Sequence, residues 1–438
     1  MQRPERTAAQ EETRIPRRSL RLVCRGRPLR VDDGAASFLV HSFLFSTTEG
    51  LPDVTLNWEN DEARWVTPDE VADFDAVPSL VRPSATNVYA STADPLPQTE
   101  ALARVLLPPA AAMAVLRLRD DRAHGSAQLA GWALDALYLW AAAPWGGASD
   151  GPRSPRAAAD GGPRWARERT AEARLRDVAY ALAASRPAMA SLRSATARVV
   201  ADATRNAGVP LGEALQAAIR AERARRDVAA AAADAAARAL LHDGLCVVTT
   251  SLSSSVLRAL CVPDTPDARA RLRVLACESR PLREGVTTAA RCAEAGHAVQ
   301  LVTDAAAAVH VAALRGADAI VLVGADAVTP AGGVVNKVGT RALAMAAAEA
   351  GVRVFAVATS DKALSAGAQA ETEEMEAAEV DSAPPRGVTV RNVYFEETPA
   401  ELISGGIIHE GGLEDAAAFA ARAAPAARTL FAEAFPDN

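Results

Sequence analysis

The stretch LCVVTTSLSSSVLRAL, residues 245–260, decides the fold. It opens with a short apolar run, continues through a loop of hydroxyl-bearing residues, and ends with apolar residues at helical spacing. A short apolar run that leads through a polar loop into a helix is typical of a strand buried in a parallel sheet. The stretch therefore predicts one strand followed by one helix.

The same pattern continues toward the end of the chain. Four further apolar runs alternate with helical segments: LRVLAC (272–277), AVQLVT (298–303), AIVLV (319–323) and VRVFAVAT (352–359). Strands at this spacing with helices between them imply βαβ units. An acidic, alanine-rich insertion (366–387) precedes a short strand VTV (388–390) and a last helix. We predict an α/β fold, with a Rossmann-like parallel-sheet domain over residues 241–438.

Upstream, residues 96–240 show a helical pattern. Apolar residues recur at spacings of three and four in AQLAGWALDALYLWAA (127–142), RDVAYALAA (176–184), SLRSATARVVADAT (191–204) and a long segment over 211–241. Such amphipathic helices pack together as a bundle. A run of Gly, Pro, Arg and Ser over residues 143–164 interrupts the pattern and predicts a disordered surface insertion.

Residues 1–95 are expected to form a separate small unit. Its strand-like stretches are SFLVHSFLF (37–45) and VTLNWEN (54–60), which flank a turn-rich segment. A linker rich in proline and small polar residues follows. We therefore predict that residues 100–438 fold without residues 1–95.

Composition narrows the class of protein. The 438 residues carry 47 basic and 54 acidic side chains, a net charge of −7, which does not favour direct binding to nucleic acid. The five scattered cysteines form no CxxC pair and predict neither a disulfide framework nor a zinc site. The sequence shows no signal peptide and no apolar run of about 18 residues, so we expect a cytoplasmic protein without a membrane partner.

Chemistry is expected at one edge of the sheet, because ligands of open parallel sheets bind beyond the carboxyl ends of the strands. Hydroxyl, guanidinium, carboxylate and ammonium groups follow those ends: Thr249, Thr250, Ser251, Ser253, Arg280, Asp326 and Lys362. Lys362 and Lys337 are the only lysines of the chain. This combination predicts a phosphorylated polyol as ligand, and no cofactor is expected.

Three longer motifs carry a family resemblance. They are ESRPLREG (278–285), VLVGADAVTPAGGVVNKVGT (321–340) and VRNVYFEETPAELISGGIIHEGG (390–412). Together they resemble the family that joins the alpha, beta and delta subunits of initiation factor 2B to ribose-1,5-bisphosphate isomerase and methylthioribose-1-phosphate isomerase. DDRAHGSAQLAGWAL (120–134) and ASRPAMASLRSA (184–195) are similar to the helical part of that family. The resemblance covers about residues 100–438.

The resemblance implies a helical domain followed by a Rossmann-like domain of the NagB/RpiA/CoA-transferase-like type. It also implies a pocket for a phosphosugar or nucleotide phosphate between the two, and a homodimer or a hetero-oligomer with related subunits. The positions that match substrate-binding motifs of the family are Arg122, His124, Gly125, Arg280, Asn336 and Lys337. His124 is equally compatible with a solvated surface histidine.

In the isomerases of this family, a cysteine and an aspartate move a proton between C1 and C2 of the sugar phosphate. Asp326 matches the aspartate, and Ser251 stands at the place of the cysteine. A hydroxyl is a far weaker acid than a thiol, whose usual pKa is about 8.5. We expect a pentose-phosphate-binding, isomerase-like protein whose aldose–ketose chemistry is weakened or absent. The alternative is a non-catalytic regulatory or scaffold subunit, related to those of the guanine-nucleotide exchange factor, so whether the chain is an enzyme stays open.

The first domain resembles a second family. Residues 37–71 look like the C-terminal half of a Nudix hydrolase domain, and AAQEETRI (8–15) looks like the tail of the Nudix box. Glu11 and Glu12 would then be vestigial metal-binding carboxylates. The box is incomplete, and a partial carboxylate set holds Mg²⁺ poorly. We expect a truncated Nudix-like domain over residues 1–95, and Nudix pyrophosphohydrolase activity is the least favoured function.

Overall fold

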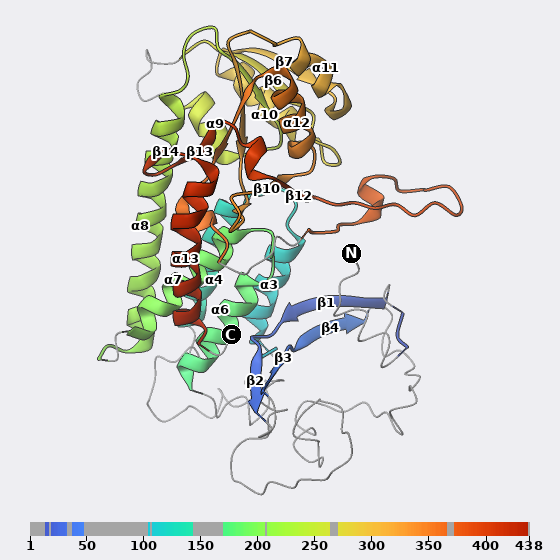
Figure 1. Ribbon diagram of the computed structural model, residues 1–438. Coiled ribbons are helices and arrows are strands. Elements are labelled where there is room, and N and C mark those ends of the chain that lie inside the picture. Colours follow the sequence, from blue (N-terminus) through green and yellow to red (C-terminus); the bar gives the residue numbers. More distant parts are fainter. Residues whose placement is uncertain are drawn as a thin grey trace, which may run out of the picture.

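The computed structural model describes residues 14–16, 19–32, 37–47, 104–105, 107–142, 170–205, 208–262, 270–365 and 372–436. In these ranges a pair of small N-terminal sheets lies against one end of a helical bundle, and a large sheet covers the other end (Figure 1). Several predictions lie outside the described residues: the carboxylates Glu11 and Glu12, the strand over 54–60, and the insertion over 143–164.

A seven-stranded sheet forms the core of the C-terminal part. Its strands are β5 (Cys246–Thr249), β6 (Arg273–Cys277), β7 (Ala298–Val302), β8 (Ala319–Gly324), β11 (Arg353–Val357), β13 (Gly406–His409) and β14 (Gly412–Glu414). The order is β14-β13-β11-β8-β5-β6-β7, and every pairing is parallel except that of β13 with β14. The five predicted strands are confirmed, and the sequence reading missed β13 and β14.

Helices cover both faces of this sheet. On one face α11 (Ala307–Ala312), α12 (Thr340–Ala350) and α13 (Ala416–Ala434) share a core with the strands, and on the other face α8 (Leu211–Arg238), α9 (Ser254–Cys261) and α10 (Glu284–Glu294) do so. Strand β8 shows how the pattern arises, because Val321 and Val323 join the first core while Ile320 and Leu322 join the second. Alternate side chains of a strand point to opposite faces, so a continuous apolar run is needed here.

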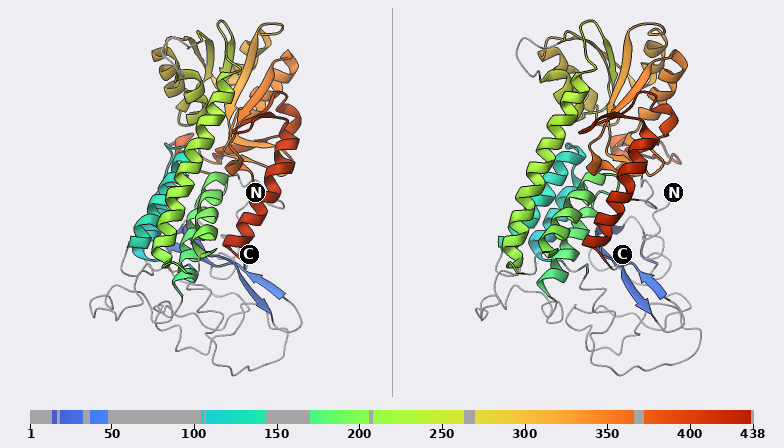
Figure 2. Two further views of the ribbon diagram at one scale, coloured as in Figure 1. Left: turned by 90° about the vertical axis from the view of Figure 1, so that its left-hand side faces the viewer. Right: turned by 60° about the vertical axis from the view of Figure 1, so that its left-hand side comes forward.

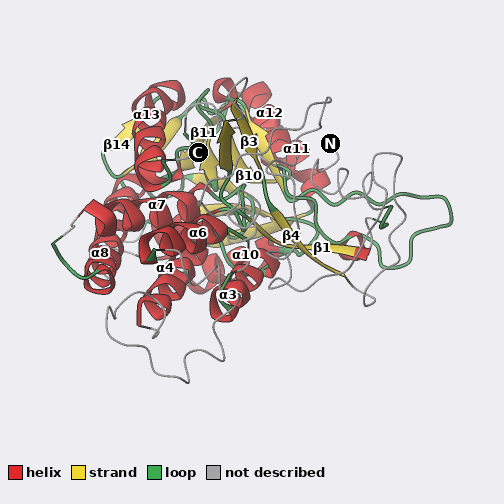
Figure 3. Cartoon of the chain, turned by 90° about the horizontal axis from the view of Figure 1, so that it is seen from below, coloured by secondary structure: helices red, strands yellow, loops and turns green. Residues whose placement is uncertain are grey.

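The helical bundle contains α3 (Pro109–Asp120), α4 (Ser126–Ala142), α6 (Ala171–Ala183) and α7 (Ala190–Arg205), together with parts of α8 and α13. Helix α7 packs against α4, α6, α8 and α13, as the view along the bundle shows (Figure 3). The long helices α8 and α13 run from the sheet into the bundle and join the two parts (Figure 2). No helix in the described ranges has the length and apolar character needed to cross a membrane.

A three-stranded sheet, β9 (Ala327–Val328), β10 (Val334–Lys337) and β12 (Phe395–Thr398), lies between bundle and large sheet. The predicted strand VTV (388–390) is wrong, because these residues form no strand and lie in a loop that projects from the body (Figure 1). Part of the acidic insertion lies within the described residues and packs against the bundle. Its Glu373 side chain is only 2% exposed and pairs with Arg186 of the bundle.

The N-terminal strands pair in two antiparallel sheets. Strand β1 (Leu20–Arg25) pairs with β4 (Phe43–Thr47), and β2 (Leu29–Asp32) pairs with β3 (Ser37–Val40). The predicted strand over 37–45 is therefore confirmed as two strands with a break at His41 and Ser42. Strands β1 and β2 were not predicted from the sequence, because arginines interrupt their apolar residues.

These strands pack into the bundle rather than standing apart from it. Cys24 of β1 and Val105 belong to the same hydrophobic core as residues of helices α3, α4, α6, α7 and α8. Arg27 forms an ion pair with Asp177 of α6 at 3.2 Å, with side chains only 4% and 3% exposed. Arg104 donates to the carbonyl oxygen of Pro28. The prediction that residues 100–438 fold without the N-terminal segment therefore involves exposing the part of the bundle core that Cys24 covers.

Replacing Arg27 by methionine should lower the free energy of unfolding by about 3 kcal/mol, because a buried carboxylate loses a charge partner. The matched control is Arg30→Met, since the Arg30 guanidinium donates to Ser37 at the exposed surface. That control should change stability by about 0.5 kcal/mol or less. Urea unfolding followed by circular dichroism measures both, and equal stability of the two variants would contradict the proposed contribution of the Arg27–Asp177 pair.

Candidate functional site

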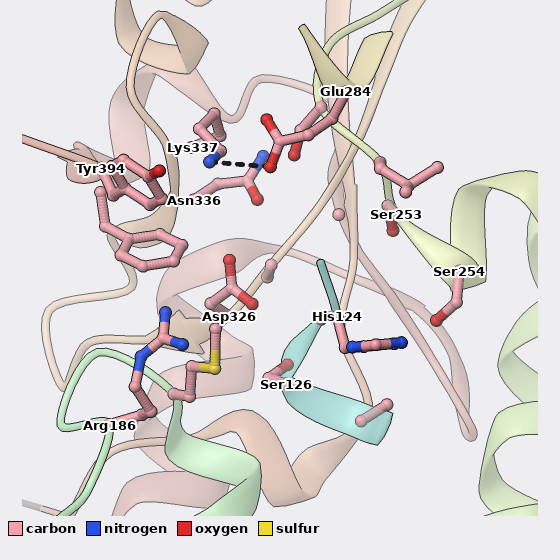
Figure 4. A pocket seen from close by; sticks show the side chains of 18 of the residues that line it. His124, Ser126, Arg186, Ser253, Ser254, Glu284, Asp326, Asn336, Lys337 and Tyr394 are labelled. Carbon is pink, nitrogen blue, oxygen red and sulfur yellow. Dashed lines mark ion pairs between the residues drawn. The ribbon is translucent and has the colours of Figure 1, made fainter. Parts of the chain in front are cut away.

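A polar cavity lies where the bundle meets the carboxyl edge of the sheet. Its walls come from the start of α4, the turn between α6 and α7, the loops after β5, β8 and β11, the start of α10, and the small sheet. Figure 4 shows the side chains that project into it. Its acidic and basic lining residues are Asp121, Arg122, His124, Arg186, Glu284, Asp326, Lys337 and Lys362.

Asp326 lies in the middle of this cavity (Figure 4). It follows β8, and its backbone N–H donates to the carbonyl oxygen of Val335 at 2.8 Å. Its own carbonyl oxygen accepts a hydrogen bond from the N–H of Ala190, the first residue of α7, at 3.1 Å. Within the described residues, no hydrogen bond or ion pair engages its carboxylate. The main chain thus fixes Asp326 while its carboxylate faces the cavity.

Lys337 forms a second charged element of the site. Its ammonium lies 2.9 Å from Oε1 of Glu284, the first residue of α10, and both side chains are largely buried. The ring of Tyr394 lies 4.1 Å from the same ammonium and adds a cation–π contact. Burial raises the pKa of Glu284, the carboxylate of Asp326 raises it further, and Lys337 opposes both effects.

Lys362 lines the cavity from the loop after β11. Its ammonium donates to the carbonyl oxygen of Ala325, and its side chain is buried. Burial lowers the pKa of Lys362, while the neighbouring carboxylates of Asp326 and Asp361 act in the opposite direction. Asn336 completes this wall and donates from its amide to Thr340 at 3.1 Å.

The loop after β5 brings hydroxyl groups to the cavity. The backbone N–H of Ser251 donates to Oγ of Ser279 at 2.7 Å, and its carbonyl oxygen accepts from Thr288 at 2.8 Å. Ser251 has a φ of 69°, so the chain turns sharply there. No cysteine is among the described lining residues. The nearby thiol of Cys277 is buried, which raises its pKa to about 12.

The segment before α4 supplies the opposite wall. Asp121 accepts hydrogen bonds from the N–H of His124 at 2.8 Å and from its ring at 2.9 Å. The imidazole also packs on the ring of Trp132, with centroids 4.7 Å apart. Arg122 donates to the carbonyl oxygens of residues 119 and 121, and its Nε lies 3.7 Å from Glu379. His124 is therefore held in place beside the cavity rather than free in solvent.

Arg186 lines the cavity from the turn between α6 and α7. Its Nε donates to the buried carboxylate of Glu373 at 2.7 Å, and its Nη1 donates to the carbonyl oxygen of Asp121 at 2.8 Å. Glu379 lies in the same acidic segment and accepts a hydrogen bond from the hydroxyl of Tyr394. The described part of the predicted insertion therefore supports two lining residues, Arg186 and Tyr394.

The structure brings most of the predicted site residues together. Those that line the cavity are Arg122, His124, Gly125, Ser251, Ser253, Asp326, Asn336, Lys337 and Lys362. Thr249, Thr250 and Arg280 do not line it. Thr249 is buried within β5, the hydroxyl of Thr250 lies 3.1 Å from that of Ser279, and the exposed side chain of Arg280 reaches the carbonyl oxygen of Val380 at 3.5 Å.

The sequence reading missed Arg186, Glu284 and Tyr394 as lining residues. Each lies inside a motif that carried the family resemblance, so the signal was present in ASRPAMASLRSA, ESRPLREG and VRNVYFEET. The predicted strand ends did not include them, because Arg186 lies in a turn between helices and Tyr394 precedes an antiparallel strand. Within the described ranges, no three His, Cys, Asp or Glu side chains converge as a metal site requires.

The chain is similar to known proteins. The sequence model of the Initiation factor 2 subunit family matches residues 159–415, more than half of the chain. The chain belongs to this family. A methylthioribose-1-phosphate isomerase of Gemmatimonas aurantiaca is 35% identical over 257 residues, which span 56% of this chain and 74% of that protein. The predicted family membership is confirmed over these residues, and the match does not include residues 1–95, which were predicted to be Nudix-like.

Two further family members show the range of relatives. A 5-deoxyribose 1-phosphate isomerase of Moorella thermoacetica is 34% identical over 55% of this chain and 73% of its own length. A ribose 1,5-bisphosphate isomerase of Archaeoglobus fulgidus is 36% identical over 171 residues. The matched region covers 37% of this chain and 52% of that protein.

The fold agrees with solved structures of the family. The translation initiation factor eIF-2B of Pyrococcus horikoshii superposes with a TM-score of 0.54 and 23% identity, over 70% of this chain and 98% of that one. This likeness confirms the predicted helical domain followed by a parallel-sheet domain.

The close packing of α10 on β6 at Gly285, next to Glu284, can be tested by its effect on stability. A Cβ at this position would lie 1.7 Å from the carbonyl oxygen of Cys277, so α10 packs on the end of β6 only with glycine there. Gly285→Ala should lower the free energy of unfolding by about 3 kcal/mol or more. The control Gly131→Ala in α4 meets nothing within 4 Å and should be neutral or stabilise by up to about 1 kcal/mol. Thermal unfolding that ranks the two variants in the reverse order would contradict this packing.

Proposed function

We propose that the cavity binds a phosphorylated pentose. Arg122, Arg186 and Lys362 supply guanidinium and ammonium groups, which bind phosphate oxygens strongly. The hydroxyls of Ser251 and Ser253 suit the hydroxyl groups of a sugar. The relatives are named as isomerases of methylthioribose 1-phosphate, 5-deoxyribose 1-phosphate and ribose 1,5-bisphosphate, and all three compounds are ribose-type phosphates.

The single observation that carries the proposal is the carboxylate of Asp326. It lies among basic side chains, and within the described residues it has no hydrogen-bonding partner, so it is open to a ligand. In an aldose–ketose isomerisation, a base removes a proton from one carbon and a proton is returned to the neighbouring carbon. Asp326 is the group placed to accept that proton.

We further propose that the chemistry is weak, because a hydroxyl replaces the expected thiol. Ser251 lies at the position that matches the family's cysteine, and no cysteine lines the described cavity. The Cys277 thiol does not line the cavity and its raised pKa keeps it protonated at neutral pH. The protein then binds a pentose phosphate and isomerises it slowly or not at all.

The replacement of the expected thiol by the Ser251 hydroxyl also favours a second function, that of a sensing or scaffold subunit. A site that keeps its basic groups but lacks the thiol would bind a sugar or nucleotide phosphate without converting it. A partner would then read the occupied state, and a second copy or a related subunit is the partner that we expect. Binding without turnover by wild type and by every variant below would support this function over an isomerase.

Ser251→Cys tests the missing thiol. A positioned acid or base typically contributes about 10²–10⁴-fold to a rate, so this variant should raise ketose formation from ribose 1,5-bisphosphate or methylthioribose 1-phosphate by that order. Ser254→Cys is the matched control, because Ser254 also lines the cavity and is exposed. It should give no gain. Robust turnover by wild type would show that serine suffices.

Asp326→Asn tests the proposed base. The amide keeps the shape of the carboxylate but cannot accept the proton, so turnover in the Ser251→Cys background should disappear while sugar-phosphate affinity stays within a few-fold. Isothermal titration calorimetry measures the affinity and a ketose assay the turnover. If no form binds any phosphosugar, the proposed pocket is wrong.

A further inference from the structure

A row of charges with alternating sign joins the long helix α8 to the cavity. Arg226 of α8 donates from Nη1 to Oδ2 of Asp361 at 2.6 Å, with side chains 13% and 6% exposed. The next residue is Lys362, whose buried ammonium reaches the carbonyl oxygen of Ala325 beside Asp326. A buried charge is tolerated when it has a partner, and here Arg226 pairs with Asp361 while Lys362 donates to a carbonyl oxygen.

Arg226 makes a second contact from the same guanidinium. Its Nη2 donates to the carbonyl oxygen of Ala127 at 2.9 Å, in the first turn of α4. Ala127 and Lys362 both line the cavity, although one belongs to the bundle and the other to the loop after β11. A planar guanidinium with several donors can hold two groups at a fixed separation, which a single ammonium cannot do.

We propose that Arg226 is a positioning residue of the candidate site. Through Asp361 it holds the ammonium of Lys362 at the cavity, and through the carbonyl of Ala127 it fixes the start of α4 opposite. Arg226 itself does not line the cavity. The proposal rests on the proposed function in taking this cavity as the phosphosugar site.

The surroundings of Lys362 make its ammonium a direct reporter of this arrangement. Burial lowers the pKa of Lys362. Four charged groups face it: the carboxylates of Asp326 and Asp361 raise the pKa, while the guanidinium groups of Arg226 and Arg258 lower it. Loss of the Asp361 charge should therefore lower the pKa of Lys362 further.

The first experiment reads this ammonium without any ligand. Because the chain has only two lysines, isotope-labelled lysine gives two side-chain signals in an NMR spectrum, and Lys337→Arg assigns them. Asp361→Asn should lower the pKa of Lys362 and leave that of Lys337 unchanged. In Arg226→Gln the Lys362 signal should shift or broaden while the Lys337 signal stays. Unchanged Lys362 signals in both variants would overturn the proposal.

The second experiment measures ribose 1,5-bisphosphate affinity by calorimetry. Arg226→Gln should weaken binding by about tenfold to a hundredfold, the loss expected when one charge-assisted hydrogen bond to the phosphate is no longer held in place. Arg226→Lys keeps the charge with a single contact and should recover only part of the loss. The control is Arg223→Gln, because Arg223 also joins α8 to α4, through Asp135, but at the exposed surface. The control should bind like wild type.

The outcomes separate the two proposals. If wild type binds the bisphosphate and Arg226→Gln binds it equally well, Arg226 has no positioning role. If wild type does not bind it, the proposed function fails, and the lysine spectra still decide whether Arg226 and Asp361 hold Lys362. A purely structural role would lower the melting temperature and shift both lysine signals together, which would also overturn the proposal.

Discussion

Two backbone hydrogen bonds of Asp326 hold the site together. One joins its N–H to Val335 of the small sheet, and the other joins its carbonyl to Ala190 at the start of α7. Because these hydrogen bonds use only the backbone N–H and carbonyl of Asp326, its side-chain carboxylate stays available to a ligand. The same contacts place the bundle against the carboxyl edge of the large sheet and bring Lys337 alongside Asp326.

Paired charges make the rest of the site possible. A lone buried charge is costly, so each buried cation of the site has a carboxylate or carbonyl partner. Glu284 forms an ion pair with Lys337, and Glu373 forms one with Arg186. The buried pair of Glu373 with Arg186 shows how part of the acidic segment packs against the bundle. A ligand that brings its own negative charge then adds to a set of groups already held in place.

The parallel sheet could be predicted because its strands are buried on both faces and read as continuous apolar runs. Strands β13 and β14 could not, because GGIIHEGG has only two strongly apolar residues between glycines and reads as a turn. Ser251, Asp326 and Lys362 could be grouped from the sequence because they follow parallel strands. Arg280 also follows a strand, but Asp304 accepts its N–H at 2.7 Å and its side chain turns to the surface.

The N-terminal strands show a different limit of sequence reading. Strand β1 contains two arginines among its six residues, and its burial becomes clear only when the bundle is placed against it. The buried partner of Arg27 lies 150 residues away, on α6. No local pattern records such a contact, so the segment read as a separate domain.

The central proposal is that a pentose phosphate binds with its reacting carbons beside Asp326. A crystal structure of the complex with ribose 1,5-bisphosphate tests this claim most directly. We expect phosphate oxygens in hydrogen-bonding contact with Arg122 or Arg186, and C1 and C2 of the sugar next to the Asp326 carboxylate. A sugar bound at another surface, or bound here with these carbons turned away from Asp326, would contradict it.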